Sequence, residues 1–388
     1  MTRKSVTILG STGSIGVSTL DVIGQLGGRE RFDVMALTGN GNIALLAEQA
    51  KLVGAKLAVT ADDRRYQELK VTLAGSGIAV ASGTSGLAEA AAMDADWVMA
   101  AIVGTAGLAP TLAAAERGAD IALANKECLV SAGPLFVEAV RRGGGKLIPV
   151  DSEHSAIFQT LEEHQRHALE RIILTASGGP FRTWSREDMA NVTVETARAH
   201  PNWSMGLKIS IGSASMFNKA LEMIEAQHLF AATPEQIEVV VHPQSIVHSM
   251  VGYTDGSVLA QLGVPDMRTA IGYALTYPAR SPLNVDRLDF AKIGRLDFEA
   301  PDEERFPALR LARLAMHRGG LQGCIMNAAE ETAFEAFVEG RIRFLQMADI
   351  VEAAMDRLSS ISPAASIEDV FAADVEARRT AAEFIAGL

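Results

Sequence analysis

Residues 6–16 read VTILGSTGSIG, an apolar run followed at once by Gly10, Gly13 and Gly16 and then by a helical pattern over residues 17–23. A strand, a glycine turn and a helix in this order are typical of a dinucleotide-binding unit, because amides at the helix N-terminus bind a pyrophosphate. The spacing is GxxGxxG rather than GxGxxG, so a turn without a ligand stays an alternative.

Five more apolar runs of strand length follow, and alanine-rich helical stretches separate them. They are residues 34–37, 57–59, 97–100, 121–124 and 146–149. Strands that alternate with helices predict a parallel sheet covered by helices. We therefore expect residues 1–150 to form a Rossmann-like, doubly wound α/β domain.

The pattern changes after residue 150. A long helix near residues 215–230 and strands near 237–241 and 257–262 indicate an α+β domain over residues 151–283. Residues 284–306 contain prolines and little periodicity, so we expect a connector. Apolar residues at helical spacing in three later stretches predict a helical domain over residues 307–388.

The composition restricts the class of ligand. With 35 Lys and Arg against 47 Asp and Glu, the net charge is -12, so no overall field attracts nucleic acid or an acidic membrane. Apolar stretches are far shorter than the roughly 20 residues that span a bilayer, and the N-terminus has no signal-peptide pattern. The two cysteines lack metal-type spacing. We expect a cytoplasmic protein with a small-molecule ligand.

Residues 36–42, ALTGNGN, end the second strand of the nucleotide domain. An NAD enzyme usually has Asp or Glu there, which bonds the ribose 2′-hydroxyl. The absence of a carboxylate favours NADPH over NADH, because a carboxylate repels a 2′-phosphate. However, no Arg or Lys stands beside Gly41 to bind that phosphate, so the pattern supports the NADPH preference only in part.

The sequence VDSEHSAIFQ follows the sixth predicted strand, at the strand end where open α/β sheets bind ligands. Asp151 and Glu153 are two residues apart, so in an extended segment they point to the same side. Such hard oxygen ligands suit Mg²⁺ or Mn²⁺. Helix capping by Asp151 or Ser152 is an equally good interpretation of this fragment alone.

A second polar group lies in KISIGSASMFNKALEMIEA, residues 208–226. Asn218 and Glu222 are four apart on one helix face, and Lys219 is next to Asn218. With the hydroxyls of Ser213 and Ser215 and the helix amides, these groups predict a phosphate site, and Glu222 could complete a three-carboxylate metal site. A capped amphipathic helix is the alternative.

Two loops complete the set of candidate sites. Ser177 precedes two glycines in TASGGPF, a backbone that forms either an anion-binding nest or a plain turn. The segment HPNWSMG, residues 200–206, places Trp203 in a loop. We interpret it as a lid that closes over substrate, with simple packing of the tryptophan against its own domain as the alternative.

Taken together, these motifs resemble the 1-deoxy-D-xylulose 5-phosphate (DXP) reductoisomerase family over nearly the whole chain. The matching blocks occur in the family's order: GSTGSIG, NKECLV, VDSEH, SGGPF, HPNWSMG, SASMFNK with Glu222, HPQSIVHS and QLGVPDMRT. Several are long and chemically unusual, so the match is much more specific than a glycine fingerprint.

The resemblance implies an oxidoreductase that uses NADPH and Mg²⁺ or Mn²⁺ to convert DXP to 2-C-methyl-D-erythritol 4-phosphate in non-mevalonate isoprenoid biosynthesis. It also implies a homodimer, a catalytic and dimerising central domain with a mobile loop, and a C-terminal helical bundle. Gly41 is the clearest departure, since many relatives have a basic residue there.

The resemblance also assigns residues by motif. The metal ligands are Asp151, Glu153 and Glu222. The substrate contacts are Lys126, Ser152, Glu153, Ser177, His200, Ser213, Asn218, Lys219 and Glu222. The catalytic set is Lys126, Glu153, His200 and Trp203. The nucleotide contacts are Thr12, Gly13, Ser14, Ile15, Gly41, Asn42, Asn125, Glu127 and Gly206.

Two other classes of function fit the sequence less well. A semialdehyde dehydrogenase would use Cys128 as its nucleophile, but a lone cysteine in the apolar run CLV is more often a small buried residue. A catalytically silent NADPH sensor would have no use for three carboxylates. Both are therefore weaker than the reductoisomerase hypothesis.

Overall fold

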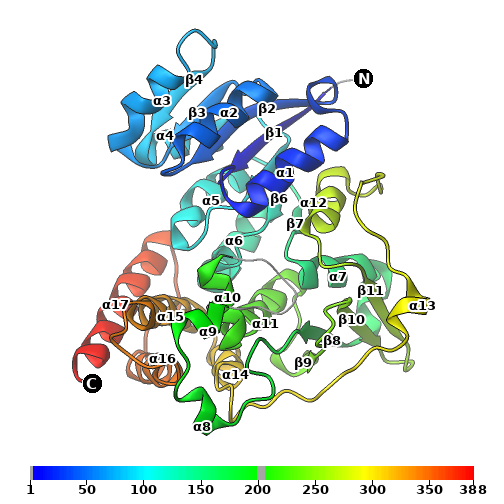
Figure 1. Cartoon of the computed structure of the whole chain (residues 1–388), viewed down its shortest axis with the longest axis vertical. Helices are drawn as coiled ribbons and strands as arrows, with labels where there is room; N and C mark the ends of the chain where they lie inside the picture. The colour runs from blue at the N-terminus through cyan, green and yellow to red at the C-terminus, as the bar shows by residue number, and fades with distance from the viewer. Residues whose placement is uncertain (1–2, 199–205) are drawn as a thin grey trace. The chain divides into compact units, whose positions relative to one another are not determined.

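The computed structural model describes residues 3–198 and 206–388 and divides into two compact units (Figure 1). Unit 1 comprises Met1–Cys128, Phe136–Ser155 and Asp266–Asp286. Unit 2 comprises Leu129–Leu135, Ala156–Pro265 and Arg287–Leu388. The four-segment division at residues 150, 283 and 306 stays a prediction.

Unit 1 is built on a seven-stranded parallel sheet of order β4-β3-β2-β1-β5-β6-β7. Its strands are β1 (Lys4–Leu9), β2 (Phe32–Gly39), β3 (Leu57–Thr60), β4 (Ala79–Ser82), β5 (Trp97–Ala100), β6 (Asp120–Leu123) and β7 (Leu147–Pro149). The strand order reverses at β1, which is where open α/β sheets bind ligands. The predicted Rossmann-like class and all six predicted strands are confirmed; β4, which is half exposed, was not predicted.

Helices pack on this sheet (Figure 1). They are α1 (Ser14–Gln25), α2 (Ile43–Val53), α3 (Tyr66–Thr72), α4 (Gly83–Ala92), α5 (Leu108–Glu116), α6 (Glu127–Gly143) and α12 (Met267–Thr276). Helix α12 comes from much later in the chain and packs against α1. It is fixed by two side chains of the sheet, because Trp97 Nε1 and Lys4 Nζ donate to the carbonyls of Ala274 and Leu275.

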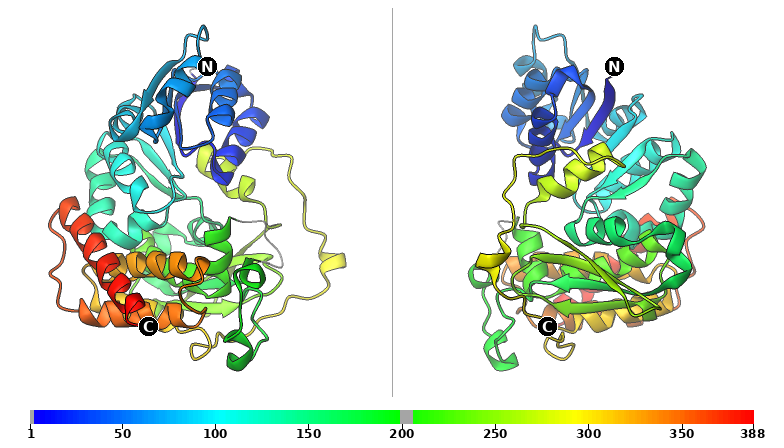
Figure 2. Two further views of the ribbon diagram at one scale, coloured as in Figure 1. Left: turned by 60° about the vertical axis from the view of Figure 1, so that its left-hand side comes forward. Right: turned by 90° about the vertical axis from the view of Figure 1, so that its right-hand side faces the viewer.

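Unit 2 contains a four-stranded mixed sheet of order β11-β10-β8-β9, shown as green and yellow-green arrows in Figure 2. Its strands are β8 (Leu169–Ala176), β9 (Ile237–Val241), β10 (Val247–Tyr253) and β11 (Val258–Leu262). The predicted strands β9 and β11 are confirmed. Strand β10 escaped prediction because His248 and Ser249 are buried polar residues that interrupt its apolar pattern.

The helices from residue 152 onward complete the chain. They are α7 (Ser152–Thr160), α8 (Arg186–Met189), α9 (Val194–Arg198), α10 (Leu207–Ala214), α11 (Phe217–Phe230), α13 (Phe290–Ile293), α14 (Ala308–Arg318), α15 (Gln322–Val338), α16 (Gln346–Arg357) and α17 (Ile367–Ala386). Helix α15 packs against both α16 and α17, so the predicted helical tail is present. The predicted connector is mostly irregular (Figure 2).

Within the described ranges, no helix combines the length and apolar character that crossing a bilayer requires.

Candidate functional site

The glycine turn after β1 leaves backbone amides available for a phosphate. Gly10 has φ +90°, and its amide donates to Thr38 Oγ1 at 2.9 Å. Helix α1 then begins after Gly13, with no side-chain cap and no acidic residue in its first turn. An uncapped helix start without negative charge fits a pyrophosphate.

The third glycine of the turn is required by packing. A Cβ atom at Gly16 would lie 2.4 Å from the carbonyl oxygen of Gly10 and 2.4 Å from Cα of Ser11. Only glycine therefore lets α1 approach the turn this closely. The sequence prediction missed two supporting residues, Thr38 and Gln49; Gln49 exchanges hydrogen bonds with Ser11 at 2.9 and 3.0 Å. A buried glutamine facing a glycine turn is a signal that only the fold reveals.

The loop after β2 carries Gly41 and Asn42, both predicted nucleotide contacts. Asn42 caps α2, because its Oδ1 accepts from the amide of Leu45 at 3.2 Å. Thr12 lies beside the same loop, since a Cβ at Gly39 would meet Thr12 Cγ2 at 3.0 Å. The structure thus gathers two of the predicted nucleotide segments at the ends of β1 and β2.

Asn125 has a structural task that the sequence did not predict. Its buried side-chain amide donates to the carbonyls of Ile102 and Gly104, the latter at 2.9 Å, and its oxygen accepts from the amide of Cys128 at 3.2 Å. It therefore holds the loop after β5.

Cys128 itself is fully buried, which does not fit the nucleophile of a semialdehyde dehydrogenase.

A carboxylate cluster stands at the carboxyl ends of β6 and β7. Lys126 Nζ lies 2.7 Å from Asp151 Oδ2, and Ser152 Oγ donates to Glu153 Oε2 at 2.6 Å. One carboxylate oxygen of Asp151 and one of Glu153 lie within 4.8 Å of each other. Because β6 and β7 are neighbouring parallel strands, Lys126 and Asp151 meet at one sheet edge. Two such oxygens suit a hard divalent cation.

The assumption of an extended segment at Asp151 and Glu153 is wrong. Helix α7 begins at Ser152, so Glu153 lies in its first turn. Asp151 Oδ1 accepts from the amide of Glu153 at 3.4 Å, so Asp151 does act at the helix start as the capping alternative proposed. The two carboxylates come together through this helix start and not through strand alternation.

In unit 2, the Ser177 turn packs against the end of α10. Gly178 and Gly179 have φ of +82° and +66°, and the amide of Gly179 donates to Ser177 Oγ at 3.2 Å. A Cβ at Gly179 would lie 2.8 Å from the carbonyl oxygen of Ser213. Ser177 and Ser213 are thereby brought onto one small surface. The bond from Gly179 to Ser177 is that of a local serine turn, so the anion-binding interpretation stays a prediction.

Helix α11 begins beside that surface and carries three polar groups. A Cβ at Gly212 would lie 3.5 Å from Asn218 Cβ, which brings the start of α11 against α10. Asn218 Nδ2 and Lys219 Nζ both donate to the carboxylate of Glu222. Lys219 and Glu222 are almost completely buried, so this ion pair is shielded from water.

The hydroxyl of Ser215 does not join this group. It is buried and donates to the carbonyls of Ile211 and Gly212, so its inclusion in a phosphate site was wrong. Met216 follows at φ +63°, a left-handed conformation that links α10 to α11. Strained backbone of this kind is often kept where a site requires it.

Four predicted residues remain. His200 and Trp203 lie outside the described residues, whereas Gly206 is exposed and precedes the first residue of α10. Glu127 is buried in the first turn of α6. Asp151 and Glu153 belong to unit 1 and Glu222 to unit 2, so a metal site shared by all three stays a prediction.

Comparison with known proteins points to one family. Family models match residues 6–133 (1-deoxy-D-xylulose 5-phosphate reductoisomerase), 147–230 and 262–380 (C-terminal domains of the same name). The 1-deoxy-D-xylulose 5-phosphate reductoisomerase of Allorhizobium ampelinum is 74% identical over 98% of this chain and 96% of its own length. That of Rhizobium rhizogenes is 75% identical over 99% and 97%.

Solved structures agree with these relatives. The reductoisomerase from Zymomonas mobilis in complex with NADPH has a TM-score of 0.95 and 53% identity, with 100% of both chains covered. A DOX-P reductoisomerase in complex with NADPH, fosmidomycin and magnesium has a TM-score of 0.93 and 43% identity, with 98% of both chains covered.

Replacing Gly179 by alanine is expected to damage the Ser177–Ser213 surface, because the new Cβ would meet the Ser213 carbonyl at 2.8 Å. We expect affinity for a phosphorylated sugar to fall about tenfold, the loss of roughly one charge-assisted hydrogen bond. Isothermal titration calorimetry with the phosphorylated sugar measures this affinity. Gly256→Ala is the control, since Gly256 has φ +88° but open space around its Cβ. Equal affinities of both variants would refute the assignment.

Proposed function

Because the chain belongs to the 1-deoxy-D-xylulose 5-phosphate reductoisomerase family, we infer that it rearranges and reduces DXP to 2-C-methyl-D-erythritol 4-phosphate, with NADPH and a divalent metal ion. This reaction belongs to non-mevalonate isoprenoid biosynthesis. Identity of 74% to a curated member over nearly the full chain is the observation that carries the conclusion.

We propose that Asp151, Glu153 and Glu222 hold the metal ion. Each carboxylate already accepts a hydrogen bond that orients it: from Lys126, from Ser152 and from Lys219, respectively. Carboxylates oriented in this way are typical of metal ligands. A bound Mg²⁺ or Mn²⁺ supplies Lewis-acid stabilisation of negative charge on the substrate's oxygen atoms.

The substrate's phosphate is proposed to lie against Ser177, Ser213, Asn218 and Lys219. The close packing at Gly179 and Gly212 supports this grouping. An anchored phosphate keeps the two carbon fragments together while the carbon skeleton rearranges, which gives recombination a high effective concentration. Lys126, Ser152, Glu153 and Glu222 are the proposed contacts at the other end of the sugar.

Proton handling is assigned to Lys126 and Glu153 as a proposal. Lys126 has three N–H donors and lies at the same strand edge as the carboxylates, 2.7 Å from Asp151. Glu153 lies at the same edge of the sheet, and its Oε2 accepts a hydrogen bond from Ser152 Oγ at 2.6 Å. General acid and base groups must lie within hydrogen-bond reach of the proton they move, and a ligand held by the proposed metal site would lie near both residues.

His200 and Trp203 are proposed to close over the substrate and exclude water, on the strength of the family resemblance alone.

NADPH supplies the hydride. Its proposed contacts are Thr12, Gly13, Ser14, Ile15, Gly41, Asn42, Asn125, Glu127 and Gly206. The proposed domain roles are nucleotide binding for residues 1–150, catalysis and dimerisation for 151–283, and a helical bundle for 307–388 after a connector.

Replacement of Glu222 by glutamine tests the metal site. The change keeps size and removes a charge, so we expect kcat at saturating Mg²⁺ or Mn²⁺ to fall at least about 100-fold with folding largely kept. The kcat is measured by following NADPH oxidation spectrophotometrically. Glu331→Gln is the matched control, because Glu331 is another shielded carboxylate that pairs with Lys208 and Arg378. Undiminished turnover of Glu222→Gln would eliminate the three-carboxylate site.

A cytoplasmic homodimer is proposed as the working form. Both cysteines are buried and form no disulfide, as suits a reducing compartment. Strand β11 lies at the edge of its sheet, and its apolar residues Val258 and Leu259 are exposed. An exposed apolar edge strand favours pairing with another chain, so we propose β11 as the dimer interface. Recovery of the native chain in the periplasmic or membrane fraction would contradict the location.

Leu259→Lys is expected to convert the dimer to monomers, because a charge on the edge strand opposes pairing. Analytical ultracentrifugation at micromolar concentration measures the mass. Val71→Lys serves as the control, since Val71 is an exposed apolar residue on α3 of the other unit. A dimer of unchanged stability in Leu259→Lys would exclude β11 as the interface.

A further inference from the structure

The loop that should receive the 2′-phosphate of NADPH has no positive charge of its own. Strand β2 ends at Gly39, and the next residues are Asn40, Gly41 and Asn42. A Cβ at Gly41 would stand in open space, with no atom within 4 Å. In NADP-binding Rossmann domains an arginine near this point accommodates the 2′-phosphate. The cation must therefore come from a neighbouring segment.

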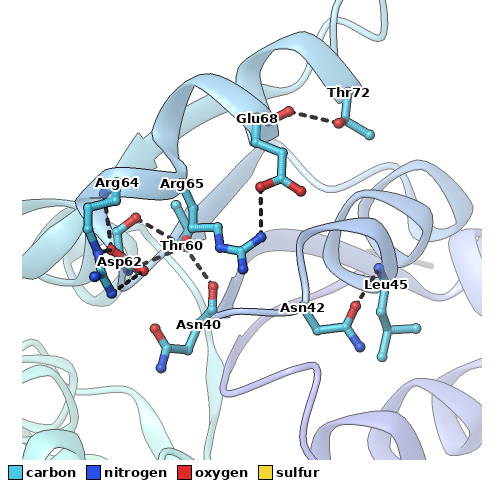
Figure 3. Close-up of polar contacts among 9 residues, drawn as sticks. All are labelled: Asn40, Asn42, Leu45, Thr60, Asp62, Arg64, Arg65, Glu68 and Thr72. Carbon is cyan, nitrogen blue, oxygen red and sulfur yellow. Dashed lines mark hydrogen bonds and ion pairs between the residues drawn. The ribbon is translucent and has the colours of Figure 1, made fainter.

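The segment after β3 is tied to this loop. Gly39 and Thr60 are register partners in the parallel β2–β3 pair. Beyond that pair, the amide of Ala61 donates to the Gly39 carbonyl at 2.8 Å. Thr60 Oγ1 donates to the Asn40 carbonyl at 2.8 Å, as Figure 3 shows. These bonds fix the exit of β3 against the exit of β2. The chain then continues into Asp62, Asp63, Arg64 and Arg65.

Arg64 is engaged by its own neighbour. Its Nε and Nη2 donate to the two carboxylate oxygens of Asp62 at 2.8 and 2.9 Å, a bidentate pair. This geometry neutralises both charges and orients the guanidinium toward Asp62. Arg64 is also 90% exposed, so the solvent surrounds it. It is poorly arranged to bind a second anion.

Arg65 has donors to spare. Only its Nη1 is bonded within the described part of the chain, to Glu68 Oε2 at 2.8 Å. In Figure 3 its guanidinium points from the start of α3 toward the side of the Asn40–Asn42 loop. An exposed pair three residues apart is weak, whereas a phosphate with nearly two negative charges binds arginine through charge-assisted bonds.

The remaining acids of this segment do not block such binding. Asp62 is paired with Arg64, as described. Asp63 is turned toward β4, where its Oδ1 accepts from Ser82 Oγ at 2.7 Å. Glu68 is then the one acid in residues 60–68 that competes for Arg65.

We propose that Arg65 binds the ribose 2′-phosphate of NADPH in place of the basic side chain missing at Gly41, and so determines the preference for NADPH over NADH. The assignment rests on the proposed use of NADPH. It makes a residue outside the glycine turn and outside the β2 loop the specificity determinant of the nucleotide site.

The test compares Arg65→Gln, Arg64→Gln and Glu68→Gln with the unaltered enzyme, in the presence of Mg²⁺ and saturating DXP. For Arg65→Gln we expect the KM for NADPH to rise about tenfold, with the KM for NADH and both kcat values within about twofold. Arg64→Gln should leave both KM values within about twofold. Glu68→Gln should lower the KM for NADPH, because the competing carboxylate is gone.

Calorimetry with two adenosine probes separates the phosphate contact from a general structural effect. Arg65→Gln should weaken adenosine 2′,5′-bisphosphate about tenfold and leave adenosine 5′-monophosphate unchanged. An unchanged ratio of the two KM values in Arg65→Gln, or an equal loss for both cofactors, would overturn the proposal. Either result would leave the proposed function standing, since the unaltered enzyme's turnover with NADPH is measured in the same assays.

Discussion

Two negative charges within 4.8 Å of each other, on Asp151 and Glu153, are the constraint on which the site depends. Carboxylates at this distance repel unless cations or hydrogen-bond donors stabilise them. Lys126 and Ser152 supply that stabilisation from adjacent positions of the same sheet edge, and the pair is proposed to hold a divalent cation. Glu222 in the second unit is held by the same chemistry, with Lys219 and Asn218 as donors.

Glycine sets how closely two backbone segments approach each other in the proposed phosphate sites of both units. At Gly16 the first turn of α1 touches the Gly10 carbonyl, and at Gly179 the Ser177 turn touches the end of α10. In each case a side chain would collide with the backbone of the neighbouring segment, so glycine is what allows the two segments to pack this closely. The nucleotide and the sugar phosphate are thus proposed to be held in the same physical way on two unrelated sheets.

Much of this could be predicted from the sequence because strand–helix alternation and unusual motifs are local signals. The six predicted strands of the first sheet and the polar start of α11 follow directly from residue patterns. Strand β8 was missed because a short apolar run fits either a strand or a buried helix. Helix α17 lies within the predicted helical tail but is not marked by its own apolar period, because small residues such as Ala373 and Ala377 form its buried face.

Side-chain assignments failed where the local backbone conformation and the actual hydrogen-bond partners decide them. The hydroxyl of Ser215 bonds back to its own helix, and Asp151 reaches Glu153 through a helix start, neither of which residue spacing reveals. Arg65 could not be selected over Arg64 without knowing that Asp62 binds the latter in two places. Sequence patterns identify the chemical groups, whereas hydrogen-bond partners decide which of those groups can serve a ligand.

The most direct measurement of the central claim is a crystal structure of the protein grown with Mn²⁺ and NADPH, with data collected at the manganese absorption edge. The account predicts one strong anomalous peak, about 2.2 Å from oxygens of Asp151, Glu153 and Glu222 together, as hard-cation coordination requires. A peak bound by Asp151 and Glu153 without Glu222, or a peak elsewhere in the molecule, would contradict it.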